Sequence, residues 1–250
     1  MIGTIRSEWI KLRTVRMNFV LTALAVIAPI VIPGLIAALG KVRDLDSRQM
    51  YDAVAGSSVL SALLWSVIGT THITSEFAFN TIRPTFAATP RRARVILAKV
   101  LVLAPATLVV QGAVTVAGLN IAASVANGRG ANVDYSSIDG FVVSAAGIAM
   151  FAALVTLFGL SIGLIVRSSP ASVALVILWP LLVEGLLTGL LLAAGLHKVR
   201  RWMPYASGQR LFTTDTADEM FGRLASGLYF AGFVALLLVI GTLLTQRRDA

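Results

Sequence analysis

The sequence predicts an all-α membrane protein in which six transmembrane helices follow an amphipathic helix at the membrane interface. Apolar residues make up 57% of the 250 residues and charged residues 13%, whereas a soluble domain has about 45–50% and roughly 25%. The apolar residues gather in six blocks, and each reaches the ~20 residues that a helix needs to cross a bilayer. These blocks fill most of one transmembrane domain over 1–250, which leaves too little soluble mass for an ATPase or another catalytic domain.

Residues 2–16 predict the interfacial helix. Apolar side chains recur there at spacings of three and four: Ile2, Ile5, Trp9 and Leu12. Charged side chains, among them Lys11 and Arg13, lie between them, which is the pattern of a helix lying in the membrane surface. We expect Trp9, Lys11 and Arg13 to meet lipid headgroups. The alternative is a solvated helix start that carries only the orientation signal.

The predicted spans cover about 18–39, 53–75, 97–126, 141–166, 171–194 and 224–245. The first apolar run is too long for the 7–15-residue core of a secretion signal, so we interpret it as a retained span. The third and fourth spans exceed the bilayer thickness, and we expect them to tilt or extend beyond it. The short turn 168–170 makes the fourth and fifth spans antiparallel neighbours.

Lys and Arg place both termini in the cytoplasm, on the inner face of the plasma membrane. They concentrate before the first span and in the loop after the second span. The loop at 195–223 also carries several and runs against this bias. The net charge of +9 therefore indicates lipid headgroups as partners, and we expect no nucleic acid.

The search for catalytic, metal and cofactor sites is negative. Cysteine is absent, and the two histidines, His72 and His197, are far apart in sequence. No group of His and carboxylates has metal-ligand spacing, and no nucleophile lies near a base. The segment 34–42 resembles a phosphate-binding loop only faintly, because its glycines are one residue too far apart and Val42 replaces the Ser or Thr that holds magnesium.

Glu184 is the one carboxylate deep inside an apolar block. An ionisable group there costs at least about 2.5–3.5 kcal/mol unless it is paired or wetted. It follows Pro180 by one turn, where a missing hydrogen bond loosens the helix. Two interpretations stay open: a lumen-facing group that touches substrate or a proton, or a carboxyl paired with Thr188 or a neighbouring helix.

Small and polar residues inside other spans are explained by packing and hydrogen bonding between helices, without a ligand. Gln111 and Asn120 are explained by hydrogen bonds between helices. The pairs Gly159–Gly163 and Gly185–Gly189 have the spacing that lets helices approach closely. Packing within one chain is the favoured interpretation, and a dimer seam is the alternative.

The loop after the second span is the most informative segment. It places apolar side chains, including Phe77, Phe79 and Phe86, among several arginines, and Pro84 and Pro90 divide it into short pieces. The loop is too short and too charged to cross the membrane. It suits a surface element that inserts aromatic side chains into a partner. The alternative is a lipid-facing elbow held by Arg and phosphate.

Two motifs resemble actinobacterial ABC-type exporter permeases of the second type. The opening Ser7-Glu-Trp-Ile-Lys-Leu-Arg-Thr14 resembles their N-terminus, and the pattern from Ser75-Glu76 through Thr81-Ile-Arg83 to Pro90-Arg-Arg92 and Lys99 resembles their loop between spans two and three. The layout of six spans matches over the whole chain. Asn80 stands where members often have Gly, and Asn also tolerates left-handed backbone angles.

The resemblance implies a division of labour. Residues 2–16 would be the connecting helix, and residues about 76–92 a short cytoplasmic coupling helix. The coupling helix would contact a separate ATPase through Glu76, Phe79, Arg83, Arg91 and Arg92. Spans two and five would line the substrate path, near Ser57, Ser61, Trp65 and Glu184. Segment 196–222 would form an external cap or gate.

The same resemblance implies the assembly. Two ABC ATPase subunits, which bind the ATP and Mg, would serve two copies of this chain or one copy and a related permease. The chain itself would be no enzyme and would hold no cofactor. Apolar spans with few polar groups favour an amphipathic or lipid-like cargo such as a drug, peptide or lipid.

Other functions are open on the sequence alone. A proton-coupled secondary transporter would use Glu184, although no two-half repeat is visible. An intramembrane enzyme would need clustered catalytic groups, and the spans hold one carboxylate. An immunity-type membrane protein would bind an antimicrobial peptide without moving it. Co-purification with an ATPase separates the permease from these alternatives.

Overall fold

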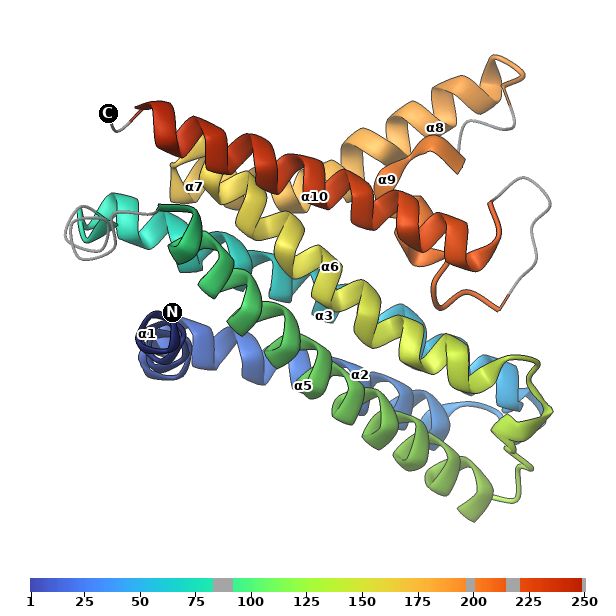
Figure 1. Ribbon diagram of the computed structural model, residues 1–250. Coiled ribbons are helices and arrows are strands. Elements are labelled where there is room, and N and C mark those ends of the chain that lie inside the picture. Colours follow the sequence, from blue (N-terminus) through green and yellow to red (C-terminus); the bar gives the residue numbers. More distant parts are fainter. Residues whose placement is uncertain (83–91, 197–200, 215–220, 249–250) are drawn as a thin grey trace.

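The computed structural model describes residues 1–82, 92–196, 201–214 and 221–248. Figure 1 shows a bundle of long helices with both termini at one end. The helices are α1 (Ile2–Thr14), α2 (Arg16–Leu39), α3 (Ser47–Ala78), α5 (Arg92–Gly128), α6 (Phe141–Val166), α7 (Ser169–Leu178), α8 (Glu184–Ala193), α9 (Pro204–Gln209) and α10 (Arg223–Arg248), with short turns η1 (Val42–Asp44), η2 (Tyr135–Ser137) and η3 (Trp179–Val183).

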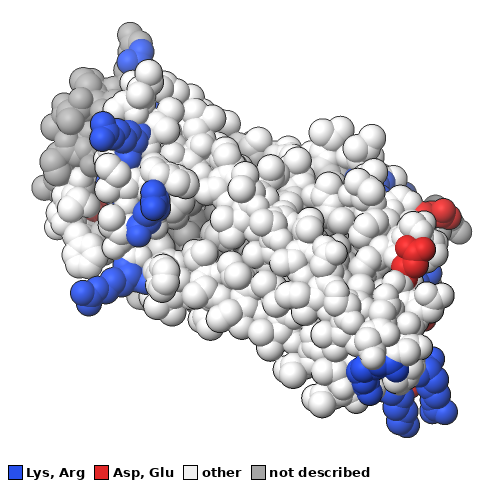
Figure 2. Space-filling view, turned by 90° about the horizontal axis from the view of Figure 1, so that it is seen from below, with Lys and Arg blue, Asp and Glu red and all other residues white. Residues whose placement is uncertain are grey.

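Six stretches of the described chain are long and apolar enough to cross a membrane: Arg16–Leu39, Ser47–Ala78, Arg92–Gly128, Phe141–Val166, Ser169–Ala193 and Arg223–Arg247. Lys and Arg gather at both ends of the face in Figure 2, with a broad uncharged belt between them. The protein is therefore an all-α, multi-pass membrane protein, as the sequence predicts. The second and third spans start five or six residues before their predicted apolar blocks, since polar turns extend them; Asp46, for example, caps α3 by accepting the backbone N–H of Gln49 at 2.7 Å.

Helices α3 and α6 form the centre of the bundle and approach each other closely. A Cβ on Gly159 would overlap the carbonyl oxygen of Ser66, and one on Gly69 would overlap that of Thr156. Gly163 similarly lies against Ile73. The Gly159–Gly163 pair therefore packs within the chain, as predicted. A Cβ on Gly185 or Gly189 would meet no atom within 4 Å, so this second pair packs against nothing within the described chain.

The fifth span is interrupted at its middle. Residues Trp179–Val183 widen into one π-helical turn between α7 and α8. Pro180 lacks the N–H that a regular helix would use, and a π-turn absorbs that loss. The loosening predicted from Pro180 is thus confirmed, and beyond it α8 leads away from α10 in Figure 1.

The described part of the predicted cap folds back toward the bundle. In α9, the ring of Tyr205 contacts those of Phe151 and Phe230 edge to face at 5.1 and 6.3 Å. Gly208 lies so close to Phe230 that a Cβ would come within 2.5 Å of its ring. These contacts hold α9 between α6 and α10. The segment 201–212 therefore packs into the protein at this end, and its role as a gate stays a prediction.

Candidate functional site

The inner face of α1 carries charged side chains. Glu8 is 1% exposed, whereas Trp9 is 44% exposed, and the Arg13 guanidinium lies 5.8 Å from the centre of the Trp9 ring. Figure 1 shows α1 nearly end-on, so its axis crosses the bundle axis. This orientation suits a helix lying in the membrane surface, with Glu8 pointing into the protein and Trp9 outward.

Glu8 joins a buried charge cluster whose members come from three helices: Glu8 and Lys11 of α1, His72 and Glu76 of α3, and Lys99 of α5. Oε2 of Glu8 accepts hydrogen bonds from Lys99 Nζ at 2.7 Å and from His72 Nε2 at 2.9 Å. Its Oε1 accepts one from Lys11 Nζ at 2.8 Å. Oε1 of Glu76 accepts from Lys99 Nζ at 2.6 Å and from Lys11 Nζ at 2.8 Å. We call these five residues the charge cluster.

Two carboxylates and two ammonium groups balance in the charge cluster. Lys99 has no exposed surface, and a lone buried ammonium would be strongly unfavourable. Here it lies between Glu8 of α1 and Glu76 of α3. Helix α5 therefore depends on α1 for one of the two carboxylates that compensate Lys99. Removing one partner of such a buried pair costs about 3–5 kcal/mol, because the other charge is left uncompensated.

The pKa values of the α1 residues reflect the same balance. Burial alone would raise the pKa of Glu8, but hydrogen bonds from His72 and Lys11 and the charge of Lys99 outweigh it and hold that pKa far below its usual range. Burial alone would lower the pKa of Lys11, but its hydrogen bonds to Glu76 and Glu8 outweigh that effect and raise it. Both groups are therefore charged at neutral pH.

The cluster adjoins the segment that the resemblance identifies as coupling helix. Glu76 still belongs to α3 and is buried, while Phe79 follows it with 78% of its surface exposed. Asn80 takes a left-handed backbone with φ of 55°, which confirms that Asn can stand in for Gly at this turn. Arg83 and Arg91 lie outside the described residues. The role of all these residues in ATPase contact stays a prediction.

At the other end of the segment between α3 and α5, Arg92 contacts the end of α10. Its Nη1 donates hydrogen bonds to the carbonyl oxygens of Thr245 and Gln246 at 3.0 and 3.3 Å. These carbonyls belong to the last turn of α10, whose oxygens have no partner within the helix. The segment between α3 and α5 is thus bracketed by the charge cluster on one side and by the end of α10 on the other.

Three residues predicted to line the substrate path point into the bundle. Ser61 donates to the carbonyl oxygen of Ala25 in α2, and Trp65 Nε1 donates to Gln111 Oε1 of α5 at 3.1 Å. Ser57 bonds to carbonyls of its own helix. The contacts of Ser61 and Trp65 hold α3 against α2 and α5. The Trp65 contact confirms the predicted interhelical hydrogen bond of Gln111. Asn120 instead bonds the carbonyl oxygen of Val116 in its own helix, at 2.7 Å.

The less covered face of α3 is formed by other residues. Gly56 and Leu60 are exposed, and Leu63, Thr71 and Ser75 are half-buried. They recur at spacings of three, four and eight, which marks one helix face. Sequence reasoning missed this face because α3 is apolar or small all round, so its pattern does not show which side the bundle covers.

Glu184 lies apart from the charge cluster. Its Oε1 accepts hydrogen bonds from Trp179 Nε1 at 2.9 Å and from the backbone N–H of Tyr205 at 2.8 Å, and its Oε2 accepts one from the backbone N–H of Ala206 at 3.0 Å. The partner is therefore the first turn of α9, where backbone N–H groups lack helical acceptors. Of the two predicted partners, the neighbouring helix is confirmed, and the hydrogen bonds of Glu184 go to α9 and Trp179 rather than to Thr188.

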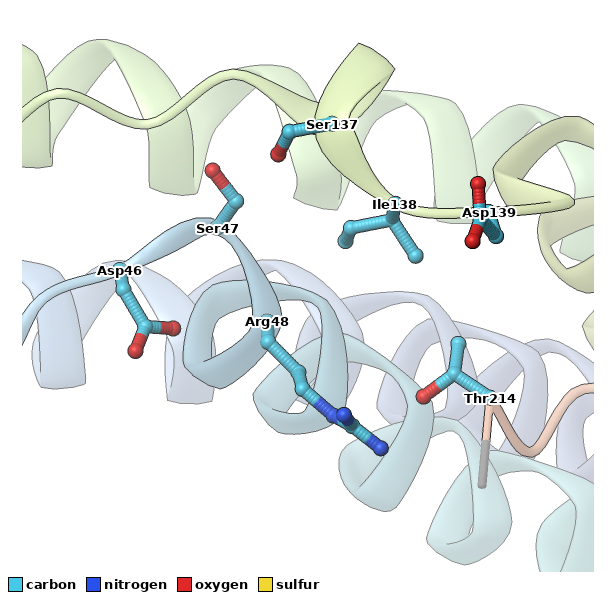
Figure 3. A pocket seen from close by; sticks show the side chains of 7 residues that line it. All are labelled: Asp46, Ser47, Arg48, Ser137, Ile138, Asp139 and Thr214. Carbon is cyan, nitrogen blue, oxygen red and sulfur yellow. The ribbon is translucent and has the colours of Figure 1, made fainter. Parts of the chain in front are cut away.

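A cavity of about 420 Å³ opens at the end of the bundle opposite the termini. It is lined by Asp46, Ser47, Arg48, Ser137, Ile138, Asp139 and Thr214. Asp46 and Asp139 lie at opposite ends of this group in Figure 3. No group of three His or carboxylate residues that could hold a metal ion occurs in the described part of the chain, so we assign no chemistry to this cavity.

In a comparison with known protein families, residues 4–183 match the family model described as ABC-2 family transporter protein. The match covers more than half of the chain and includes most of α1, the charge cluster and the fifth span as far as Val183. No curated protein matches the chain.

Proposed function

This chain belongs to the ABC-2 transporter family and is a membrane permease component of an ABC transporter; from that premise we propose that it is the permease of an exporter powered by a separate ATPase. The family works with ABC ATPases in general, and the ATPase carries the catalysis. We infer that ATP and Mg bind there, and that two ATPase subunits serve two copies of this chain or one copy and a related permease.

The observation that carries this proposal is the bracketed segment between α3 and α5. Its ends are held by the charge cluster and by the Arg92 contacts to α10. A push on the segment therefore acts at once on α1, α3, α5 and α10. Phe79 offers an exposed aromatic ring beside that point, and such anchors dominate protein contacts.

The proposed cycle is alternating access. Closure of the ATPase dimer on ATP moves the coupling segment and tilts the helices fastened to it, while the fifth span bends at its π-turn. The central path between copies then opens outward. ATP supplies the bias, and the permease supplies two states with different affinities for an amphipathic or lipid-like cargo.

Two features support the proposed placement in the plasma membrane with both termini inside. The termini share one end of the bundle in Figure 1, and on the face in Figure 2 that end shows chiefly Lys and Arg, whereas the opposite end shows both signs of charge. Such a bias fits the cytoplasmic side. The proton-coupled alternative is less favoured, because both oxygens of Glu184 already accept hydrogen bonds from N–H groups of Trp179 and α9.

The test is co-purification of the ATPase with an epitope-tagged chain. Phe79→Asp should lose the ATPase, because a charge replaces the exposed ring. Leu39→Asp is the matched control, since Leu39 is about as exposed as Phe79 (80%) and ends α2, at the end of the bundle away from the termini. It should retain the ATPase. Equal recovery with both variants would contradict the proposed contact, and no ATPase with the unaltered chain would contradict the permease assignment itself.

A further inference from the structure

A cavity of about 430 Å³ lies between α3, α8 and α9. Helix α3 contributes Val59 and Leu63, which form an apolar wall. Helix α8 contributes Glu184 and Thr188, one turn apart. Helix α9 contributes Tyr205 and Gln209, also one turn apart. Polar side chains thus line the cavity from two helices while a third supplies apolar surface, the combination found in small-molecule sites.

Glu184 brings an uncompensated charge to this cavity. The side chain is 5% exposed, and it accepts hydrogen bonds from three N–H groups. Among the described residues no Lys, Arg or His forms an ion pair with it. A carboxylate has about four acceptor positions, so one remains on Oε2. Ionisable groups inside a membrane pair with an opposite charge or mark a substrate path.

Tyr205 holds α9 in place beside this cavity. Its ring packs against Phe151 and Phe230, and its hydroxyl is buried without a hydrogen-bond partner within the described chain. Because that hydroxyl has almost no accessible surface, it does not serve the cavity as a binding group. The charged group that a ligand in the cavity would meet is Glu184.

We propose that this cavity binds the protonated amine of a cationic amphipathic compound. The ammonium supplies the full positive charge that Glu184 lacks, and the apolar body lies on Val59 and Leu63. Anionic compounds are repelled by the carboxylate, and neutral ones leave its charge uncompensated. The inference rests on the proposed function only in treating this ligand as the cargo.

The test measures binding to the purified chain in lipid nanodiscs, without ATPase or ATP. The probes are a dodecylamine and a dodecanol, each carrying a dansyl group at the far end of the alkyl chain. Trp179, whose ring contacts Glu184, transfers excitation energy to bound dansyl. Empty nanodiscs give the partition into lipid. The amine should bind at least about tenfold more tightly than the alcohol, the scale of one charge-assisted hydrogen bond.

Glu184→Gln should remove that preference. The amide keeps an oxygen for the N–H of Tyr205, so α9 remains held, and the Kd of the alcohol should change by less than about twofold. A merely structural role of Glu184 would shift both probes equally. Loss of both probes together, or a preference for the amine that survives Glu184→Gln, overturns the proposal. So does a lack of preference in the unaltered chain, which needs no variant to fold.

Thr188 allows a second test that leaves the contacts of Glu184 to α9 intact. Thr188→Lys should place the chain's own ammonium beside Glu184 and abolish the preference for the amine. Thr242→Lys is the matched control, a half-buried Thr of α10 outside the cavity, and should leave the preference unchanged. Equal behaviour of both variants contradicts the site. Failure of the ATPase contact would leave these binding results untouched, so the two proposals are tested separately.

Discussion

The two buried carboxylate sites of this protein differ in how their charge is met. In the charge cluster, Glu8 and Glu76 face Lys11 and Lys99, so the charges balance within the chain. Glu184 faces only N–H groups of Trp179 and α9 among the described residues. The first site joins three helices at the end with the termini. The second lies in a cavity beside the interrupted fifth span.

The difference indicates two different uses of a buried charge. A cluster with balanced charges needs no further counter-ion, although Glu76 Oε2 is buried without a hydrogen-bond partner among the described residues. Each of its helices is held by the others, which suits a joint that transmits force. An unbalanced carboxylate is satisfied in its hydrogen bonds but lacks a counter-ion, which suits a site that receives one.

Lys99→Met should have the largest effect. It leaves Glu8 and Glu76 with too little positive charge in a buried place, and we expect a loss of about 3–5 kcal/mol. For a chain of this size that corresponds to a fall in Tm of roughly 10 °C. The fall is measured by intrinsic fluorescence of the purified protein during heating.

The control for this change is Lys41→Met, since Lys41 is exposed at the opposite end. Its Tm should stay within about 2 °C of the unaltered protein, as for most surface changes. Equal, small shifts of Tm for both variants would show that the charge cluster contributes little to stability. The proposed difference between the charge cluster and the Glu184 site would then be wrong.

Glu184→Gln should have a smaller effect, about 1–2 kcal/mol. The amide can still accept from one backbone N–H of α9, so the variant loses part of a helix cap and leaves no opposite charge unpaired. The same heating experiment measures it. A loss as large as that of Lys99→Met would mean that Glu184 has an ionic partner and that the two sites are alike.

Docking of α1 should be independent of pH over a wide range. The pKa of Glu8 is lowered, so its contribution is complete above the ordinary value of 4.5 and is lost as pH falls toward the lowered value. The pKa of Lys11 is raised, so its contribution is complete below 10.5 and is lost as pH rises past that value. A spin label at Arg6→Cys should therefore show constant mobility from about pH 7 to 10, above the range in which an imidazole such as that of His72 ordinarily titrates. A mobility transition inside this range would contradict this.

Ser57→Ala should have almost no effect. The hydroxyl bonds only to carbonyl oxygens of its own helix, so its loss should change stability by less than about 0.5 kcal/mol. Binding of the dansyl amine should also be unchanged. A clear loss of amine binding would return Ser57 to the substrate path and would shift the path away from the cavity beside Glu184.

The sequence predicts most of the fold because the bilayer requires long apolar helices, and such helices appear in the sequence as apolar blocks. Only helices and closed barrels satisfy backbone groups in a bilayer, and the six apolar blocks have the ~20 residues of a helix rather than the ~9–11 of a barrel strand. The widened turn after Pro180 and the close packing at Gly159 also follow from local chemistry. Asn80 at a left-handed position is a third case, because the residue type alone permits it.

The charge cluster could not be predicted in the same way. Glu8, His72 and Lys99 come from three helices, and their approach depends on how the bundle packs. Glu8 and Lys99 each look like ordinary interfacial charges at a helix end. The local signals are the spacing of four between His72 and Glu76 and the spacing of three between Glu8 and Lys11, each of which puts two residues on one helix face. The hydrogen bonds of Glu184 to α9 were equally unpredictable, because Tyr205 and Ala206 lie about 20 residues further along the chain.

We infer that α1 moves as one body with the helices fastened by the charge cluster. The chain has no cysteine, so pairs of spin labels can be introduced at Arg6 with Leu97 in α5, and at Arg6 with Leu186 in α8. Distances are measured in the complex with its ATPase, without nucleotide and with ATP trapped by vanadate. The account predicts an unchanged distance from Arg6 to Leu97 and a changed distance from Arg6 to Leu186. A shift between Arg6 and Leu97 as large as that to Leu186 would contradict it.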